Sequence, residues 1–283
     1  MTKTLIVTGA NTGLGLSIAI AAAQAGFKTY ATMRNLDKRT ALQTQAAVAG
    51  VTTLQLDVED TASVQACVAE VMARDGHIDA FVANAGMGFA RATEQTTEAE
   101  IAKVMDVNFM GLVRCVKAVL PHMRAARSGR ILAVSSVGGL VGQPFNEVYC
   151  ASKFAMEGYM ESLASYVGPA FGLHFSLLEP GGISSEFVAR ALKQIEGSGG
   201  FLQDEYLPIL QKYMSTRQSR SEGVFQTPED VAAVALKCLT MAKSPIRLRS
   251  STWAENFSNF KTVGDPDGLK QQAAVVTEML GGF

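Results

Sequence analysis

Short apolar runs, rich in aliphatic and β-branched residues, alternate with longer stretches along most of this chain. Several of the runs end at Gly, Asn or Asp, where a chain commonly leaves a sheet. Runs of this length and composition are typical of buried strands. We therefore predict strands at residues 3–8, 28–33, 51–56, 78–83, 130–134, 173–178 and 246–249.

Many of the intervening stretches repeat apolar residues three and four positions apart, which is the period of an amphipathic helix. In residues 60–74, one side carries Val64, Cys67, Val68 and Val71. The pattern predicts a helix that follows the first strand and ends at Ala25, and further helices at residues 37–48, 60–74, 97–105, 108–125, 148–166 and 228–241.

Strands that alternate with helices in this way are joined by right-handed crossovers and lie parallel. The predicted fold is therefore α/β, a doubly wound, Rossmann-type parallel sheet with helices on both faces. One domain, residues 1–250, accounts for the alternation. Residues 184–226 depart from it and are interpreted as an insertion over the carboxyl edge of the sheet. Residues 251–283 are expected to form a C-terminal extension packed on the same domain.

Composition narrows the possible partners. Of the 283 residues, 48% are hydrophobic and 18% charged, and the net charge is −1. These values predict a globular core and no nucleic-acid partner. No apolar run reaches the length of a membrane span, and the N-terminus lacks the apolar stretch of a signal peptide, so we expect neither feature.

The cysteines and histidines give no sign of a metal site. Cys67, Cys115, Cys150 and Cys238 are scattered without the close spacing of a zinc or redox motif. We interpret them as reduced core thiols of a cytoplasmic protein. The three histidines are far from one another in the sequence, so we expect no metal.

A glycine-rich turn links the first predicted strand to the first predicted helix. Glycines let a backbone approach a pyrophosphate closely, and the N-terminus of the next helix offers free N–H groups and a partial positive charge. A glycine-rich turn without a ligand is the alternative, but the position after the first strand favours dinucleotide binding. The candidate contacts are Gly9, Asn11, Thr12, Gly13, Leu14 and Gly15.

The second predicted strand ends at Met33-Arg34. NAD-specific folds usually have an acidic residue here that binds the ribose 2′-hydroxyl. An arginine can instead hold a 2′-phosphate through two hydrogen bonds. The sequence therefore predicts NADP(H) over NAD, with Arg34 as the discriminating residue, and a solvated surface arginine is the alternative.

Polar residues also follow the third and fourth predicted strands. Ligands of open α/β sheets bind beyond the carboxyl ends of the strands, so these residues are candidate cofactor contacts. For any one of them, an ordinary turn is the alternative. They are Asp57, Val58, Asn84, Ala85 and Gly86.

Tyr149 and Lys153 are four residues apart in the predicted helix 148–166 and therefore share one face. A free phenol has a pKa of about 10. A nearby ammonium favours the phenolate and lowers that pKa. The pair is a candidate proton donor and acceptor. On spacing alone, an exposed helical pair without a function is the alternative.

From residue 3 to residue 184, the order of these motifs resembles the single-domain branch of the short-chain dehydrogenase/reductase family. The glycine spacing Thr-Gly-x-x-x-Gly-x-Gly carries the resemblance first. Other segments are similar to the steroid and retinol dehydrogenases of that family: Tyr30–Arg34, Ser136–Gly139 and Pro144–Ala155. The resemblance implies an oxidoreductase that interconverts a carbonyl and an alcohol with a nicotinamide cofactor.

The resemblance also implies a catalytic set of Asn108, Ser136, Tyr149 and Lys153. Tyr149 exchanges a proton with the substrate oxygen, and Ser136 hydrogen-bonds to that oxygen. Lys153 lowers the pKa of the phenol and, with Tyr149, contacts the cofactor. Asn108 anchors a water that relays protons to Lys153.

Further cofactor contacts follow from the same resemblance. Asp57 faces the adenine, and Asn84-Ala85-Gly86 steadies the sheet and the cofactor. After the sixth strand, the backbone of Pro180, Gly181 and Ile183 contacts the nicotinamide amide. The family more often has Pro-Gly-x-Val-Thr, whereas Ser184 and Ser185 follow here, so the owner of the hydroxyl contact stays open.

The insertion predicts a bulky apolar, steroid- or retinoid-like substrate. Apolar residues at helical spacing follow the glycine-rich run 197–200, which we interpret as a hinge. They are Phe201, Leu202, Tyr206, Leu207, Ile209, Leu210, Tyr213 and Met214. Phe187 precedes this run, and the opposite wall is expected to comprise Met87, Phe89, Val137, Phe145 and Val148.

Alternatives remain open at this point. A small polar or acyl ketone is an alternative substrate. An acidic substrate is another, since cations of the insertion offer an anchor for it: Arg190, Lys193, Lys212, Arg217 or Arg220. A non-catalytic dinucleotide-binding regulator, or an isomerase or dehydratase of the family's extended branch, are other classes. The resemblance implies a homo-oligomer, a dimer or tetramer, through helices 108–125 and 148–166, whose apolar faces serve equally well as core.

Overall fold

The computed structural model describes residues 2–38, 50–197, 199–221, 224–270 and 273. Seven strands form one sheet in the order β3-β2-β1-β4-β5-β6-β7, and every neighbouring pair is parallel. The strands are β1 (Thr4–Val7), β2 (Lys28–Met33), β3 (Thr52–Gln55), β4 (Ala80–Ala83), β5 (Gly129–Val134), β6 (Leu173–Glu179) and β7 (Arg247–Arg249). All seven strands were predicted, with ends that differ by one or two residues.

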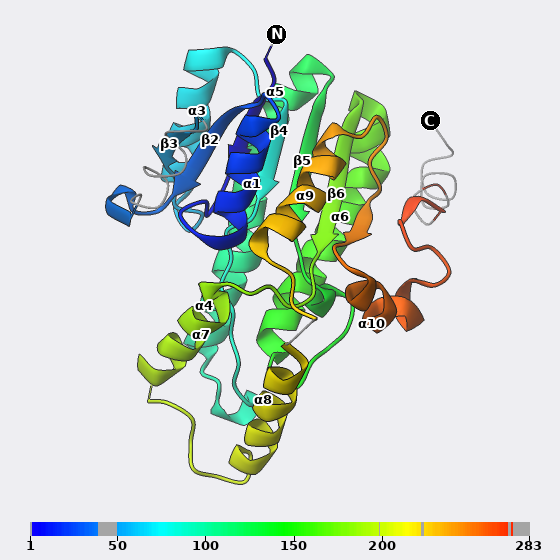
Figure 1. The fold of residues 1–283 in the computed structure, drawn as a ribbon. Coiled ribbons are helices and arrows are strands. Elements are labelled where there is room, and N and C mark those ends of the chain that lie inside the picture. Colours follow the sequence, from blue (N-terminus) through cyan, green and yellow to red (C-terminus); the bar gives the residue numbers. More distant parts are fainter. Residues whose placement is uncertain (1, 39–49, 198, 222–223, 271–272, 274–283) are drawn as a thin grey trace.

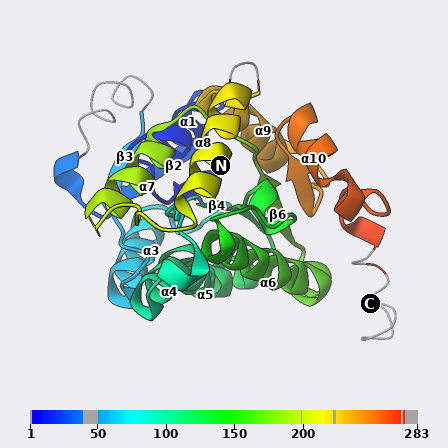
Figure 2. The ribbon, with the colours of Figure 1, turned by 90° about the horizontal axis from the view of Figure 1, so that it is seen from below.

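Helices cover both faces of the sheet (Figures 1 and 2). Those on one face are α1 (Gly13–Gln24) and α9 (Pro228–Thr240). On the other lie α3 (Thr61–Asp75), α5 (Gly111–Ala126) and α6 (Glu147–Phe171). Alternate residues of the strands point to the two faces, and each face packs its own buried apolar cluster. The predicted α/β fold with helices on both faces is confirmed.

Local capping sequences set where several helices begin. Thr97 and Glu100 exchange hydrogen bonds at the start of α4 (Glu98–Met105), and Thr227 and Asp230 do the same before α9. In the described part of the chain, three segments form short 3-10 turns: η1 (Leu36–Lys38), η2 (Thr93–Gln95) and η4 (Val137–Gly139). The helix predicted at 37–48 lies outside the described residues from residue 39 onward.

The chain reverses its winding direction between β1 and β4, which are neighbours in the sheet. The crossovers that leave these two strands go to opposite sides, which opens a crevice beyond their carboxyl ends. The glycine-rich turn after β1 and the Asn84-Ala85-Gly86 segment after β4 both lie at this crevice. The fold therefore brings the predicted cofactor contacts to one place.

The insertion contains two helices, α7 (Glu186–Gly197) and α8 (Leu207–Ser221), which lie beyond the carboxyl ends of the strands (Figure 1). The helix predicted from Phe201 was wrong in its start, and α7 was not predicted. Asp204 accepts a hydrogen bond from the Tyr206 N–H at 2.9 Å, so the chain turns there before α8 begins. Gly199 and Gly200 before it have φ values of 100° and 74°.

Three further features concern the C-terminal extension, membrane crossing and the cysteines. The helix α10 (Thr252–Thr262) lies in the C-terminal extension, beside the edge of the sheet formed by β7 (Figure 1). Among the described residues, no helix combines the length and the apolar character needed to cross a bilayer. All four cysteines are buried and unpaired.

Candidate functional site

The glycine-rich turn packs tightly against the end of β4. Gly9 has a φ of 63°, and a Cβ there would lie 2.9 Å from the Cα of Ala85. A Cβ on Gly15 would lie 2.4 Å from Asn84 Nδ2. The Asn84 amide holds the turn in place, because it donates to the carbonyls of Thr8 at 2.9 Å and Gly9 at 3.2 Å. Glycine is therefore required at both positions by space alone.

The start of α1 is open to an anion. Thr12 occupies the N-cap position, but its side chain makes no capping hydrogen bond to α1, and the first turn contains no acidic residue. Gly13, with a φ of 58°, begins the helix next to it. The first N–H groups of a helix have no partner within the helix and attract negative charge. The turn therefore fits the pyrophosphate of a dinucleotide.

Arg34, Asp57 and Val58 lie at the ends of β2 and β3, as predicted from the sequence. The Arg34 side chain is 68% exposed, and its Nη1 lies 3.3 Å from Oε2 of Glu59. Asp57 accepts a hydrogen bond from the Glu59 N–H at 3.0 Å. Glu59, which also pairs with Lys103, was missed by the sequence reasoning. The Glu59 carboxylate pairs with the Arg34 guanidinium, which a 2′-phosphate would also have to contact.

Asn108 lies in a π turn, η3 (Asp106–Met110), between α4 and α5. Its Oδ1 accepts from the Met87 N–H at 2.8 Å, and its Nδ2 donates to the Met87 carbonyl and to Ser152 Oγ, both at 3.0 Å. It is 1% exposed. The turn of wider pitch displaces Asn108 from the ordinary helical path. A Cβ on Gly86 would lie 3.3 Å from Asn108 Oδ1 and 3.9 Å from Lys153 Nζ.

Ser136, Tyr149 and Lys153 lie together next to this segment. The Lys153 Nζ is 5.8 Å from the centroid of the Tyr149 ring. A Cβ on Gly138 would lie 3.3 Å from Cε1 of the same ring, and the Gly138 N–H donates to Ser136 Oγ at 3.0 Å. Ser136 is partly exposed, whereas Ser135 is 3% exposed.

Lys153 is an unusual lysine because it is 4% exposed. Its Nζ donates to the carbonyl of Val134 at 2.8 Å. Burial lowers its pKa to about 8. The ammonium is therefore still the main form at pH 7, but it is held in surroundings that disfavour its charge.

The segment after β6 borders the same place. The Pro180 carbonyl accepts a hydrogen bond from the Val137 N–H at 3.0 Å. Ile183 pairs with Gln226, which ties the two ends of the insertion together. A Cβ on Gly181 would lie 2.8 Å from the Trp253 ring of α10. The C-terminal extension thus packs directly against the segment predicted to contact the nicotinamide.

A model of the family described as short chain dehydrogenase matches residues 3–196. The chain belongs to this family. It is an oxidoreductase that acts on CH–OH groups, and its family binds a nicotinamide dinucleotide. The resemblance predicted from the sequence is confirmed.

Known relatives of this short-chain dehydrogenase match nearly its whole length. Retinol dehydrogenase 8 from Bos taurus is 38% identical over 281 residues, covering 94% of this chain and 86% of that protein. The 17-beta-hydroxysteroid dehydrogenase type 1 from Homo sapiens is 37% identical over 292 residues, covering 99% and 87%. The crystal structure of a short-chain dehydrogenase from Streptomyces avermitilis has a TM-score of 0.78 at 29% identity and covers 98% of both chains.

In this dehydrogenase, helix α7 contacts both Tyr149 and the glycine-rich turn. The Phe187 ring lies 6.1 Å from the Tyr149 ring, in an edge-on arrangement. Arg190, one turn further along α7, donates from Nη2 to Thr12 Oγ1 at 3.0 Å. Phe187 was predicted as part of the substrate wall. The contact of Arg190 with the turn was missed, because 178 residues separate the two side chains.

An open cavity of about 330 Å³ lies between α8 and the segment that precedes α6. Its floor includes Phe145, which is 6% exposed and has a φ of 59°, rare for a residue with a side chain. Phe145 packs against Leu210 and the Tyr213 ring of α8. The cavity is lined by Ala92, Thr93, Pro144, Phe145, Glu147, Tyr206 and Ile209.

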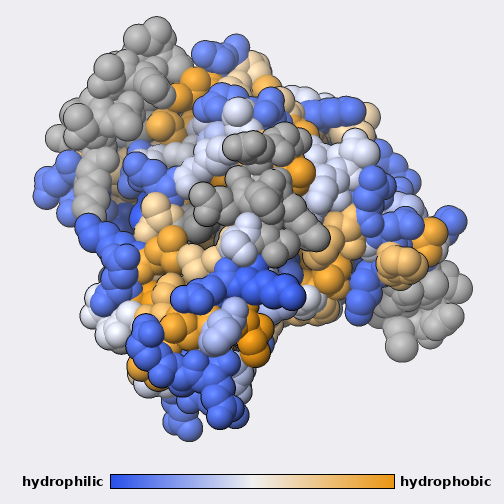
Figure 3. All heavy atoms as spheres, turned by 60° about the horizontal axis from the view of Figure 1, so that its bottom comes forward, coloured by the Kyte–Doolittle hydropathy of each residue, from blue (hydrophilic) through white to orange (hydrophobic). Residues whose placement is uncertain are grey.

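Other predicted wall residues divide between core and site. Phe89 and Val137 are buried, whereas Met87 and Val148 are partly exposed. The side chains of Arg217 and Arg220 lie outside the described part of the chain. Hydrophobic residues gather between polar ones on the end of the molecule that carries the insertion (Figure 3).

Proposed function

We propose that this protein is an NADP(H)-dependent dehydrogenase that interconverts a bulky apolar ketone or aldehyde and its alcohol, with Tyr149 as general acid and base. The observation that carries the proposal is the convergence of Ser136, Tyr149 and Lys153 beside the glycine-rich turn. Asn108, whose amide is fixed by Met87 and Ser152, lies at the inner end of this group.

The bound nicotinamide supplies and accepts the hydride. In carbonyl reduction, Tyr149 gives its phenolic proton to the substrate oxygen, and in alcohol oxidation it takes a proton from that oxygen. Ser136 donates a hydrogen bond to the same oxygen. The ammonium of Lys153 stabilises the phenolate that each proton transfer leaves or requires. Asn108 Oδ1, already fixed by the Met87 N–H, orients the path by which Lys153 exchanges protons with water.

The preference for NADP(H) rests on Arg34. No acidic residue stands at the end of β2, and the guanidinium is exposed enough to meet a phosphate. Binding requires the guanidinium to exchange Glu59 for the phosphate. An exposed ion pair of this kind is worth about 1 kcal/mol or less, whereas a bidentate charged contact to phosphate is stronger, so the exchange is favourable.

The apolar substrate class rests on α7 and α8. Phe187 places an aromatic ring against Tyr149, and the cavity between α8 and the segment before α6 is lined in part by Phe145 and Ile209. Lipid-like ligands bind in pockets of this character. The names of the two relatives, a retinol and a steroid dehydrogenase, agree with this class. Arg190 is engaged by Thr12, which disfavours it as an anchor for an acidic substrate.

A substrate panel tests the proposal. Steroids, retinoids, long-chain acyl ketones and sugars are incubated with each of the reduced and oxidised cofactors, and the nicotinamide absorbance is followed. We expect turnover of hydrophobic compounds with NADPH or NADP⁺. Activity confined to sugars or small charged keto acids would refute the apolar class.

A matched pair of variants then assigns the pocket. Phe187→Ala removes the ring beside Tyr149 and is expected to raise KM for the largest apolar substrate by several-fold. Phe260→Ala truncates a side chain that is 99% exposed and is expected to leave KM unchanged. Equal KM values in the two variants would remove Phe187 from the pocket.

The same proposal includes self-association through α5 and α6. Phe154 and Tyr166 of α6 are 43% and 49% exposed, and a second copy of the chain packed on this helix would cover them. Light scattering coupled to gel filtration is expected to give a dimer or tetramer, and Phe154→Glu is expected to weaken it. A monomer at micromolar concentration would contradict the proposal.

A further inference from the structure

A row of ionisable side chains continues inward from the catalytic tyrosine along α6. Tyr149, Lys153, Glu157 and Glu161 follow one another at intervals of four and share one helix face. Glu157 is 6% exposed, and its carboxyl oxygens have no well-aligned hydrogen bond among the described residues, although Ser135 and Glu179 lie near enough to interact with them. A buried carboxyl without such bonds is costly unless it is neutral. The proposed mechanism does not use it.

Two further buried oxygens that lack a well-aligned hydrogen bond among the described residues lie near Glu157. Ser135 Oγ comes from the end of β5, and Glu179 Oε1 from the end of β6. A Cβ on Gly139 would lie 2.7 Å from Ser135 Oγ and 2.9 Å from Glu157 Oε1, so both oxygens face the same glycine. Burial first, and then the charge of Glu179, raise the pKa of Glu157 well above its ordinary value. Each carboxyl also responds to a hydrogen bond with the other, which raises the pKa of Glu157 and lowers that of Glu179, as expected when the two share a proton.

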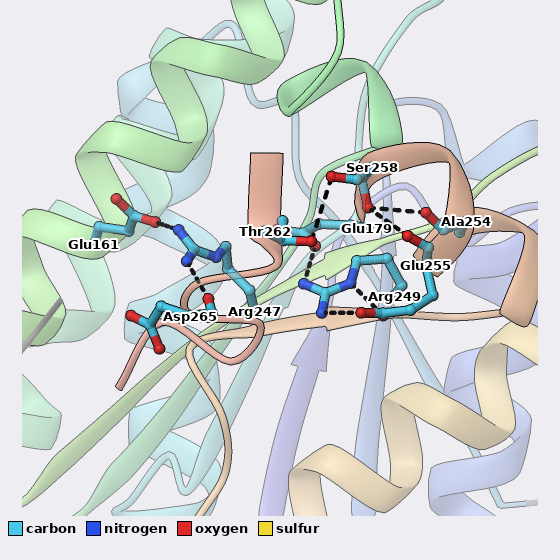
Figure 4. Close-up of polar contacts among 9 residues, drawn as sticks. All are labelled: Glu161, Glu179, Arg247, Arg249, Ala254, Glu255, Ser258, Thr262 and Asp265. Atoms are coloured by element: carbon cyan, nitrogen blue, oxygen red, sulfur yellow. Dashed lines mark hydrogen bonds and ion pairs between the residues drawn. The ribbon is translucent and has the colours of Figure 1, made fainter. Parts of the chain in front are cut away.

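Glu179 is held by an ion pair that reaches the C-terminal extension (Figure 4). It is fully buried, and its Oε2 lies 3.1 Å from Nη1 of Arg249 in β7. The guanidinium also binds both carboxylate oxygens of Glu255 in α10, at 2.6 and 3.0 Å. The Arg249 side chain is 4% exposed. Burial raises the pKa of Glu179 as well, but Arg249 opposes this rise.

These contacts divide one proton and one charge between the two acids. Adjacent buried carboxylates do not both ionise. Arg249 stabilises the charge on Glu179, whereas Glu157 forms no ion pair among the described residues. The other charged groups near the pair are Lys153, whose Nζ donates to a carbonyl, Glu161, and Arg247, which pairs with Glu161.

We propose that Glu157 is the proton-bearing member of a buried Glu157–Glu179 pair and a positioning residue for Lys153. As a neutral acid, Glu157 leaves the charge of the Lys153 ammonium to Tyr149 instead of neutralising it. Arg249 fixes the negative charge on Glu179, and Glu255 of α10 holds the Arg249 guanidinium in place, so the C-terminal extension takes part. This inference rests on the proposed function for its kinetic consequence only.

The protonation state is tested without any substrate. Infrared difference spectra of the wild type and Glu157→Gln at pH 7 are expected to show the C=O stretch of a protonated carboxylic acid in the wild type and its loss in the variant. Absence of that band from the difference would overturn the inference. The proposed function has no part in this outcome, so the two fail separately.

The pH profile of kcat/KM for alcohol oxidation tests the consequence. Glu157→Gln is expected to keep the midpoint of the profile, because an amide imitates the neutral acid. Glu179→Gln releases Glu157 to ionise beside Lys153, and the midpoint is expected to rise by about 0.5 to 1 pH unit. The double variant is expected to restore it.

A shift in Glu157→Gln as large as that in Glu179→Gln would show that Glu157 is charged in the native protein and would overturn the inference. Circular dichroism checks the fold of each variant. If Glu179→Gln does not fold, Arg249→Met replaces it, because it removes the cation that keeps the negative charge on Glu179 and is expected to shift the midpoint in the same direction. No rise in either variant would equally count against the inference.

Discussion

Replacing Gly15 with alanine tests how the glycine-rich turn is held against the sheet. The added Cβ would lie 2.4 Å from Asn84 Nδ2 and 2.5 Å from the Gly9 carbonyl oxygen, whereas ordinary contacts of a Cβ are 3.4 to 4 Å. The Asn84 amide, or the turn itself, must therefore move by about 1 Å. Either movement breaks the two hydrogen bonds of Asn84 to the Thr8 and Gly9 carbonyls.

The magnitude follows from these contacts. Overpacking costs about 1 to 3 kcal/mol, and the two lost hydrogen bonds cost about 0.5 to 1.5 kcal/mol each. The better helix propensity of alanine returns about 1 kcal/mol. Gly15→Ala is thus expected to lower the free energy of unfolding by roughly 1 to 5 kcal/mol. The displaced turn is also expected to weaken cofactor binding.

Urea unfolding and a fluorescence titration with NADPH measure the two effects. Gly158→Ala is the matched control, since Gly158 also lies within a helix but a Cβ there would meet no atom within 4 Å. It is expected to gain about 0.5 to 1 kcal/mol. If Gly15→Ala were as stable as Gly158→Ala, the close packing of the turn on Asn84 would be refuted.

Three more predictions concern charged side chains. Arg34→Asp is expected to lower kcat/KM for NADPH by about 100-fold or more and to favour NADH, and a wild type that already prefers NADH would contradict the assignment. Lys153→Met is expected to be more stable than the wild type below pH 8 by about 3 kcal/mol, because the lysine pKa falls from 10.5 to about 8 on folding. The wild type gains stability between pH 8 and 10.5, so unfolding measured at several pH values should show the advantage of the variant vanish over this range. Arg190→Met is expected to raise the Kd of NADPH by about 2- to 10-fold through loss of its contact with Thr12, and equal Kd values in Arg190→Met and the control Lys193→Met would contradict it.

Most of the fold could be predicted from the periodicity of hydrophobic residues. The strands and the helices that cover the sheet have apolar faces that local sequence reveals, so they were predicted to within a few residues. The helix α7 was missed although Phe187, Ala191 and Ile195 repeat at intervals of four, because this pattern was overlooked within the insertion. Ser185 before it and Asp204 before α8 are start signals that better predict both helices.

The site was predictable in part for the same reason. The order of the motifs identified Tyr149 and Lys153 as candidates. The periodicity of hydrophobic residues does not distinguish the π turn at Asn108 from an ordinary helix. Contacts between distant segments were beyond local reasoning. Glu157 and Glu179 are an example, because their polarity predicts exposed positions and only the tertiary fold buries them together.

The rate of carbonyl reduction by Tyr149→Phe tests the central claim most directly. Tyr159→Phe is the control, because Tyr159 lies on the same helix and packs edge-on against Phe109. The account predicts that Tyr149→Phe loses at least about 100-fold in kcat while its Kd for NADPH stays within about twofold, and that Tyr159→Phe keeps its rate. A Tyr149→Phe enzyme that kept more than about a tenth of the wild-type rate would contradict the assignment of Tyr149 as the proton donor.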